Sequence, residues 1–171
     1  MKIQIIDGAR EAELINDVVV KSLNPKKNYL HIDVGGGSTE LNFYRNQEKF
    51  ASKSFKIGSV RLLEGKEKEG DWDKMKKWIS LQMESLRGPV HAVGTGGNIS
   101  KLYNLSTQVG EDKTMDIQEL QRISDFISSY SYEERVNKLR LNTDRADVIV
   151  PAASIYLTAM ELAGCQTIFV P

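Results

Sequence analysis

The chain has 171 residues, and its 23 basic residues (Lys and Arg) balance its 23 acidic residues (Asp and Glu), so the formal net charge is zero. That balance gives no support to a protein that binds nucleic acid or an anionic membrane through its overall charge. The single cysteine, Cys165, excludes an internal disulfide, no apolar run is long enough to cross a membrane, and the first residues lack the features of a signal peptide, so we expect a cytoplasmic protein.

Three closely spaced strands dominate the first third of the chain. Before them we expect a short strand over Lys2–Ile6 and a helix over Ala9–Ser22, whose apolar residues follow helical spacing. Alternating apolar and polar residues then predict strands at Asn28–Val34, Glu40–Arg45 and Glu48–Ile57. Asn46-Gln47 is predicted to form the turn between the last two, so the three strands are expected to form an antiparallel meander.

Helices dominate the rest of the chain. The strongest is Asp71–Leu86, for which Asp71 is the predicted N-cap. Two short buried strands are expected among the helices, at Val90–Val93 and Thr167–Val170. The other expected helices are Ser59–Glu64, Ile99–Leu105, Asp116–Tyr130, Tyr132–Leu139 and Asp144–Leu162.

The order of these elements predicts an α/β fold in a single domain over residues 1–171. Strands that alternate with helices imply parallel crossovers, whereas the opening meander is antiparallel. A five-stranded mixed sheet of the ribonuclease-H-like kind, with helices on both faces, fits this order. Such a unit normally ends with a helix, but this chain stops on an apolar strand at Val170-Pro171, so we expect it to be part of a longer protein.

The most informative stretch is Asp33–Glu40, in which three adjacent glycines separate two strand-like runs. Glycine weakens a strand, but backbone N–H groups that no Cβ atom shields can approach an anion closely. Ser38 and Thr39 add hydroxyl donors, and Asp33 and Glu40 add carboxylates that can hold a divalent cation. We interpret the stretch as a phosphate-binding loop beside a metal site. The alternative is a tight hairpin in which glycine only supplies a positive φ.

A second glycine-rich loop, Gly94–Asn98, leaves a buried strand and enters a helix. Free N–H groups and the helix dipole make a helix N-terminus favourable for an anion, and the alternative is that the loop is only a tight connection between strand and helix. Two such loops at the ends of neighbouring strands could bind a phosphate chain from two sides. Arg61 and Arg145 are candidates to reach phosphate oxygens, because arginine suits bidentate binding, although surface ion pairs would explain them equally well.

These loops resemble those of the exopolyphosphatase/guanosine pentaphosphate phosphatase family, within the actin-like superfamily. The family's Asp-x-Gly-Gly-Gly-Ser-x-Glu signature reads here as Asp33–Glu40. Its upstream acidic segment reads as Asp7–Ala12, and its second glycine-rich turn reads as Gly94–Asn98. Two weaker matches are Ile57–Leu62 and Asp144–Pro151, so the resemblance covers essentially the whole chain.

The resemblance implies Mg²⁺-dependent hydrolysis of a terminal phosphoanhydride, in polyphosphate or in guanosine penta- or tetraphosphate. It implies catalytic roles for Glu11 and Glu40, and metal binding by Asp33 and Glu40. The sequence departs from the family pattern at Arg10, Glu13 and Asn98. The candidate phosphate-binding residues, which come from the two loops and the later arginine, are Gly35, Gly36, Gly37, Ser38, Thr39, Gly94, Thr95, Gly96, Gly97, Asn98 and Arg145.

Members of this family have a preceding lobe with its own Asp-x-Gly-Ser loop, which nothing in this sequence matches. The resemblance therefore implies that the chain is the C-terminal lobe of the phosphatase core, without the first lobe and the final strand–helix unit, and that it is inactive alone. Its expected partner is the missing lobe or a second copy of the chain, as in a homodimer. The alternative functions are the ATP-binding lobe of an actin-like kinase and a non-catalytic anion-binding module.

Both histidines and the cysteine are expected to be structural. His31 and His91 are interpreted as sheet residues with satisfied nitrogens, because no acid or cysteine spacing completes a metal site with them. Cys165 precedes a buried strand and is expected to be an inert core thiol.

Overall fold

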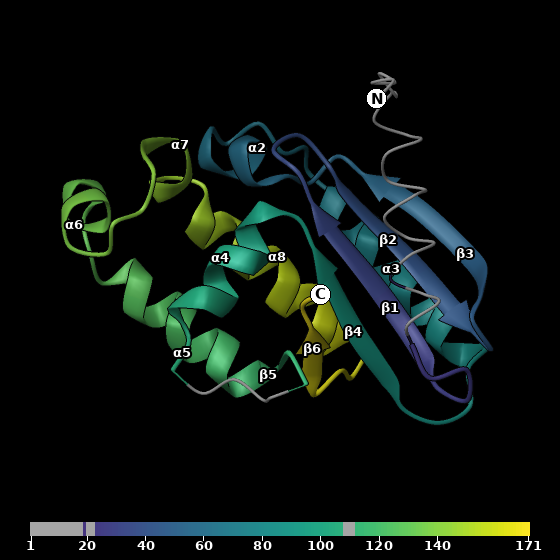
Figure 1. The fold of residues 1–171 in the computed structure, drawn as a ribbon. Coiled ribbons are helices and arrows are strands. Elements are labelled where there is room, and N and C mark those ends of the chain that lie inside the picture. Colours follow the sequence, from purple (N-terminus) through teal and green to yellow (C-terminus); the bar gives the residue numbers. More distant parts are fainter. Residues whose placement is uncertain (1–18, 20–22, 108–111) are drawn as a thin grey trace, which may run out of the picture.

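The computed structural model describes residues 19, 23–107 and 112–171 (Figure 1). The expected strand over Lys2–Ile6 lies outside these residues. So does the expected helix over Ala9–Ser22, apart from Val19, which is helical and buried. From residue 23 onward, the described chain forms a mixed sheet with helices packed against it.

Within the described residues the sheet contains six strands, and their pairing matches the predicted topology. In chain order the strands are β1 (Asn28–Val34), β2 (Thr39–Arg45), β3 (Glu48–Phe55), β4 (Val90–Thr95), β5 (Thr114–Asp116) and β6 (Thr167–Phe169). Their spatial order is β3-β2-β1-β4-β6-β5. The first three pair antiparallel, whereas β4 pairs parallel with both β1 and β6. The expected meander with later parallel crossovers is confirmed.

The predicted count of five strands is wrong by one, because β5 adds a sixth strand at the edge of the sheet. This strand has three residues and pairs antiparallel with β6. Of its three side chains, that of Met115 is the buried one. So short a segment carries no alternating pattern from which a strand could be read.

The turn between β2 and β3 forms where it was predicted. Asn46 and Gln47 have φ angles of 54° and 64°, and a two-residue hairpin turn of type I′ requires positive φ at both positions. Asparagine tolerates this conformation better than most residues. The turn fixes the register in which β2 and β3 pair.

One face of the sheet carries the main hydrophobic core, to which β1 contributes Leu30, Ile32 and Val34. Helix α8 contacts α2, α3, α4 and α5 as well as β1, and its long apolar run reflects burial on several sides. In chain order the helices are α2 (Ser59–Leu63), α3 (Asp71–Glu84), α4 (Gly97–Leu105), α5 (Ile117–Ser128), α6 (Tyr132–Asn137), α7 (Thr143–Ala146) and α8 (Ile149–Leu162).

The helix expected over Asp144–Leu162 is two helices, α7 and α8, and Pro151 explains the break. Proline has no backbone N–H and collides with the carbonyl four residues earlier when it lies inside a helix. In the structure Pro151 lies in the first turn of α8, where the N–H groups have no partner within the helix. A continuous helix from Asp144 would have placed it in the interior.

The start of α3 also differs from the prediction. Gly70, with φ of 82°, is the N-cap, and Asp71 is the first helical residue. Asp71 Oδ2 accepts a hydrogen bond from the Lys68 amide at 3.1 Å, and Oδ1 accepts one from Lys74 Nζ at 3.0 Å. Asp71 therefore links the preceding turn to the helix. Gly70 occupies the N-cap because glycine adopts the left-handed conformation found there at no steric cost.

The second face of the sheet is covered differently. A smaller apolar cluster there contains Val19, Tyr29, Tyr44 and Val93, with Leu23 packed against it. Helices α2–α8 each contribute to the core on the first face. Of the helix expected over Ala9–Ser22, the described residues include Val19 alone, and its side chain belongs to this cluster.

Candidate functional site

The loop between β1 and β2 is docked on the N-terminus of α2. The Gly35 carbonyl accepts a hydrogen bond from the Ser59 amide at 3.0 Å. The Gly36 carbonyl accepts from the amides of Val60 and Arg61, each at 3.0 Å. The carbonyl oxygens of the loop therefore satisfy the amides that open the helix.

This docking leaves two loop amides without a partner. The Gly35 amide donates to the Ser38 carbonyl at 2.9 Å, whereas the amides of Gly36 and Gly37 donate to no acceptor within the described part of the chain. Next to them is a depression of about 430 Å³, which Arg61 and Lys66 help to line. The loop is thus a hairpin connection that still has amides available for an anion.

The hydroxyl of Thr39 and the guanidinium of Arg61 are committed to the backbone around this loop. Thr39 is fully buried, and its Oγ1 donates to the Ile57 carbonyl at 2.6 Å. Arg61 Nε donates to the Gly37 carbonyl at 3.0 Å. Both contacts hold the loop in place. The Thr39 hydroxyl thus bonds the backbone instead of standing ready for phosphate, and Arg61 bonds the loop instead of forming a surface ion pair with a described residue.

The carboxylates of Asp33 and Glu40 share one face of the sheet. The two residues are direct partners across β1 and β2, and directly paired residues point to the same side. Both side chains are partly buried. Among the described residues no group of three His, Cys, Asp or Glu side chains could hold a metal. A pair of carboxylates still suits Mg²⁺, which keeps several waters and commonly shares its remaining ligands with substrate phosphates.

The second glycine-rich loop lies beside the first. Gly96, with φ of 97°, follows β4 as the N-cap of α4, and Asp33 Oδ1 lies 3.1 Å from the position that a Cβ atom of residue 96 would occupy. Gly94 serves packing, because a Cβ atom there would lie 2.8 Å from Ile168 and 2.9 Å from Ile99. The two loops therefore converge at the ends of β1 and β4, which are adjacent parallel strands.

Arg145 is brought from α7 to the N-terminus of α4. Its guanidinium occupies the space that a side chain on Gly97 would need. Asn98 follows within the same helical turn and is partly buried. Within the described part of the chain, no acceptor bonds the Arg145 guanidinium. A cation at an N-terminus opposes the helix dipole, so this arrangement favours an anion between the two.

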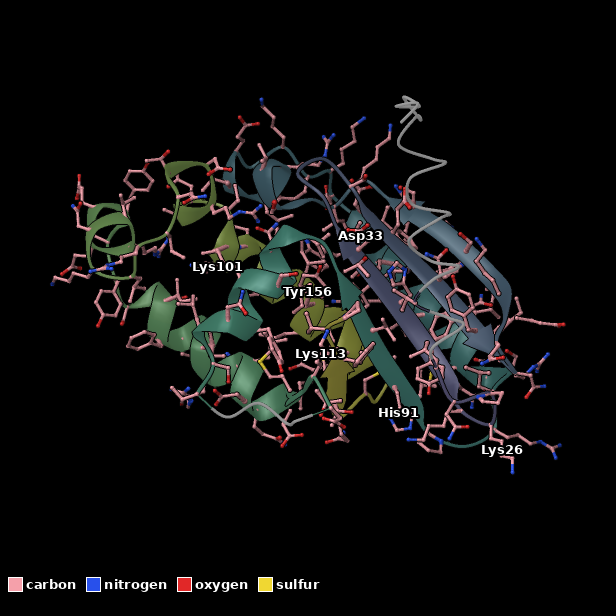
Figure 2. The ribbon with its side chains drawn as sticks, viewed as in Figure 1. Lys26, Asp33, His91, Lys101, Lys113 and Tyr156 are labelled. Atoms are coloured by element: carbon pink, nitrogen blue, oxygen red, sulfur yellow. The ribbon has the colours of Figure 1, made fainter. Side chains whose placement is uncertain are left out.

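Tyr156 connects the two strand ends and was not anticipated from the sequence. Its hydroxyl donates to the Thr95 carbonyl at 2.7 Å and accepts from the Val34 amide at 3.4 Å. Complete burial raises the pKa of Tyr156, and the charge of Asp33 adds to this effect. In Figure 2, Tyr156 and Asp33 lie close to the end of the central strands. Its apolar helical surroundings gave no sequence signal, because a buried tyrosine finds its hydroxyl partner only through the fold.

The structural interpretation of His31 and Cys165 is confirmed. Both nitrogens of His31 have polar partners, Thr95 Oγ1 at 2.8 Å and Asn42 Nδ2 at 3.2 Å. Burial, with a smaller contribution from Lys49, lowers the pKa of His31 to about 4. Burial also raises the pKa of Cys165 to about 12, which makes the thiol inert.

His91 fits its interpretation less well. Its ring packs against Tyr29 with centroids 5.9 Å apart, and no described residue bonds either ring nitrogen. Burial, with a contribution from Lys27, lowers the pKa of His91. His91 is thus a partly exposed packing residue near the start of β4, far from the glycine loops, and the expected protein partners of its nitrogens are not found among the described residues. Glu11, the predicted catalytic glutamate, lies outside the described residues.

The described helices include none long and apolar enough to span a membrane.

Sequence comparison matches the chain to a family of phosphatases. A family model described as the Ppx/GppA phosphatase family matches residues 1–168. The chain is 28% identical over 176 residues to the guanosine-5'-triphosphate,3'-diphosphate pyrophosphatase of Aliivibrio fischeri strain MJ11. It is 26% identical over 177 residues to the protein of the same name from Photobacterium profundum. These matches cover 96% and 97% of this chain but 35% and 36% of those proteins, so the chain spans about a third of their length.

Structural comparison gives the same picture. A member of the Ppx/GppA protein family from Aquifex aeolicus matches with a TM-score of 0.71 at 25% identity, covering 99% of this chain and 60% of that one. An exopolyphosphatase from Cytophaga hutchinsonii matches with a TM-score of 0.73 at 23% identity, covering 99% and 61%. The expected actin-like α/β fold is confirmed by the first of these likenesses, and the second likeness, at its lower identity, speaks to the fold alone.

Proposed function

The chain belongs to the Ppx/GppA phosphatase family, and we propose that it supplies one wall of a site that hydrolyses the terminal phosphoanhydride of polyphosphate or of guanosine penta- or tetraphosphate. One observation carries this proposal. Two amides, at Gly36 and Gly37, bond no acceptor among the described residues, and they lie on the loop that joins two carboxylates facing the same side of the sheet. Hydrolysis of a phosphoanhydride needs donors that bind the phosphoryl oxygens and a cation that neutralises their charge. The amides can supply the first, and the carboxylates can hold the second.

The terminal phosphate is proposed to bind between the two glycine loops. The amides of Gly36 and Gly37, the Ser38 hydroxyl and the first amides of α4 contribute neutral donors, and Arg145 contributes a positive charge. These groups are positioned before substrate arrives, because the backbone of each loop is held by the fold. Preorganised donors stabilise charge that develops on the equatorial oxygens during the reaction.

The metal is proposed to bind at Asp33 and Glu40. The two side chains offer oxygen ligands on one face, which is the donor chemistry that Mg²⁺ prefers. When bound there, Mg²⁺ supplies positive charge that neutralises the phosphate chain. Glu11 is proposed to orient or deprotonate the attacking water, a role that general bases perform within hydrogen-bonding distance of the water.

Charge-removing variants test this assignment. In a protein that contains both lobes, Asp33→Asn and Glu40→Gln are each expected to lower the rate of phosphate release at least about 100-fold, because each removes a ligand charge from the metal site. The matched control is Glu48→Gln, an exposed acid at the far end of β2 and β3, opposite Arg45. Its rate is expected to stay within about twofold of the original. Normal turnover of Glu40→Gln would overturn the proposal.

A further inference from the structure

A chain of hydrogen-bonded polar side chains crosses the second face of the sheet. It runs through four neighbouring strands: Ser52 on β3, Asn42 on β2, His31 on β1 and Thr95 on β4. Ser52 Oγ lies 2.6 Å from Asn42 Oδ1, Asn42 Nδ2 lies 3.2 Å from His31 Nδ1, and His31 Nε2 lies 2.8 Å from Thr95 Oγ1. Of these residues, Asn42, His31 and Thr95 are buried.

The distances fix the direction in which the protons point. A separation of 2.6 Å between Ser52 and Asn42 is typical of an O–H···O bond and too short for an N–H···O bond. The amide oxygen of Asn42 therefore faces Ser52, and its NH₂ group faces His31. Because His31 Nδ1 accepts this N–H, the neutral ring carries its proton on Nε2.

The direction of these hydrogen bonds leaves the hydroxyl proton of Thr95 free to point toward the candidate site. His31 Nε2–H donates to Thr95 Oγ1, so the proton of the Thr95 hydroxyl must point to another acceptor. No such acceptor is found among the described residues. Thr95 is the direct partner of Asp33 across β1 and β4, and it immediately precedes the turn at Gly96. Its proton is therefore available where the two glycine loops converge.

We propose that Thr95 donates its hydroxyl proton to an oxygen of the bound phosphate chain, and that Ser52, Asn42 and His31 are positioning residues that fix this polarity. This inference rests on the proposed function, because it requires phosphate between the two loops. With the opposite polarity, Thr95 would donate to His31 and would present lone pairs to an anion. The same side chain would then repel the ligand that it is placed to bind.

The tautomer of His31 is the first test, and it needs neither substrate nor a variant. Nitrogen-15 NMR of the 171-residue chain, labelled at its histidines, distinguishes a protonated ring nitrogen from an unprotonated one. We expect the Nε2–H tautomer at neutral pH. The Nδ1–H tautomer would overturn the inference and would leave the proposed function untouched, because the glycine-loop amides and carboxylates do not depend on it.

Two serines on one strand provide a matched pair for the second test. Ser52 and Ser54 are both exposed and lie two positions apart on β3, so they point to the same face. Ser52→Ala is expected to release the Asn42 amide and to populate both His31 tautomers. Ser54→Ala removes none of the hydrogen bonds between Ser52, Asn42, His31 and Thr95, so His31 is expected to keep the Nε2–H form. An unchanged tautomer in Ser52→Ala would show that Ser52 does not set the polarity.

Binding of Mg²⁺-tripolyphosphate, measured by titration calorimetry, tests the role of Thr95. Thr95→Val is expected to weaken binding about tenfold, as loss of a hydrogen bond to a charged group does, whereas Thr95→Ser is expected to retain the affinity. Equal affinity in Thr95→Val and the original chain would overturn the inference alone. Failure of the original chain to bind tripolyphosphate would overturn both the inference and the proposed function.

Discussion

The hydroxyl of Tyr156 is the point at which the ends of two central strands are joined. It is fully buried, donates to the Thr95 carbonyl and accepts from the Val34 amide. A backbone group left without a partner in a buried position costs free energy, because water cannot replace the lost bond. Tyr156 therefore contributes to stability through the two strand ends that also carry the candidate site.

Tyr156→Phe is expected to lower the free energy of unfolding by about 1–3 kcal/mol, because it leaves the Thr95 carbonyl without its donor. Urea denaturation measures this change. Tyr132→Phe is the matched control: Tyr132 is 39% exposed, and its hydroxyl lies 3.5 Å from the Thr143 carbonyl. The control is expected to change the unfolding free energy by less than about 0.5 kcal/mol. Equal losses in the two variants would contradict the role of Tyr156.

Gly97 makes room for Arg145, and this contact can be tested by a double-mutant cycle. Gly97→Ala is expected to displace the guanidinium from the N-terminus of α4, since an added Cβ would occupy its space. The cost in stability is expected to be small, because the end of an arginine side chain can move. Binding of tripolyphosphate is expected to weaken about tenfold in Gly97→Ala, in Arg145→Ala and in the double variant alike. Additive losses would mean that the two residues act independently.

Docking of the β1–β2 loop on α2 depends on the absence of a side chain at Gly58. A Cβ atom there would collide with the backbone of Gly36 and Gly37, which cannot move away as a flexible side chain can. Gly58→Ala is expected to lower the unfolding free energy by about 1–3 kcal/mol. Gly37→Ala, where a Cβ atom would meet nothing within 4 Å, is expected to cost less than about 0.5 kcal/mol. Thermal or urea denaturation of both variants checks the comparison.

Helix α5 carries an ion pair whose contribution should depend on pH. The hydrogen bond from Arg122 to Glu119, at 2.6 Å, is the main reason that the pKa of Glu119 lies below its ordinary value of 4.5. Burial raises this pKa in part, and a hydrogen bond from Ser106 lowers it further. The folded state thus favours the carboxylate, so the stabilisation is present above the ordinary pKa and is lost as the pH falls through the lower folded pKa.

Glu119→Gln is therefore expected to destabilise the protein near neutral pH, and by progressively less in acid below about pH 4.5. Urea denaturation at several pH values measures the difference from the original protein. Glu133→Gln, an exposed residue on α6, serves as the control and is expected to show little difference at any pH. A constant difference for Glu119→Gln from neutral to acid pH would exclude the ion pair as its source.

The sequence predicts the elements whose signal is local and misses those whose signal is distant. The β2–β3 hairpin follows from alternation and two turn residues, and α3 follows from helical spacing. Strand β5 depends on pairing with β6, about fifty residues later, so three residues could not reveal it. The polar chain through His31 could not be read either, because it exists only once the register of four strands is set.

The candidate site was foreseen to a similar extent. The glycine loops are evident in the sequence, because adjacent glycines between strands mark either a tight bend or a close approach to the backbone. The roles of individual residues in the loops are not evident from the sequence. Gly94 leaves room for the side chains of Ile99 and Ile168, and the Thr39 hydroxyl donates to the Ile57 carbonyl. These roles depend on which atoms the fold brings within contact. A motif therefore locates the site, while the structure assigns the parts within it.

All the described groups of the candidate site lie along one edge of one sheet. The carboxylates of Asp33 and Glu40 come from β1 and β2, and Arg145 approaches from α7. A phosphate chain bound there would contact these described groups from one side. Exclusion of water strengthens each electrostatic contact, so a site of this kind gains most of its catalytic effect when a second wall closes over it.

The 171-residue chain on its own is therefore expected to bind tripolyphosphate and Mg²⁺ but to release phosphate at least about 100-fold more slowly than a protein with both lobes. Calorimetry measures the binding, and a colorimetric phosphate assay measures the release. Addition of the separate first lobe should raise the rate, whereas the Glu40→Gln variant should prevent this rise. Rapid release by the purified chain at all concentrations would mean that one lobe suffices. Release that appears only as the chain concentration rises, together with a dimer in sedimentation, would identify a second copy as the missing wall.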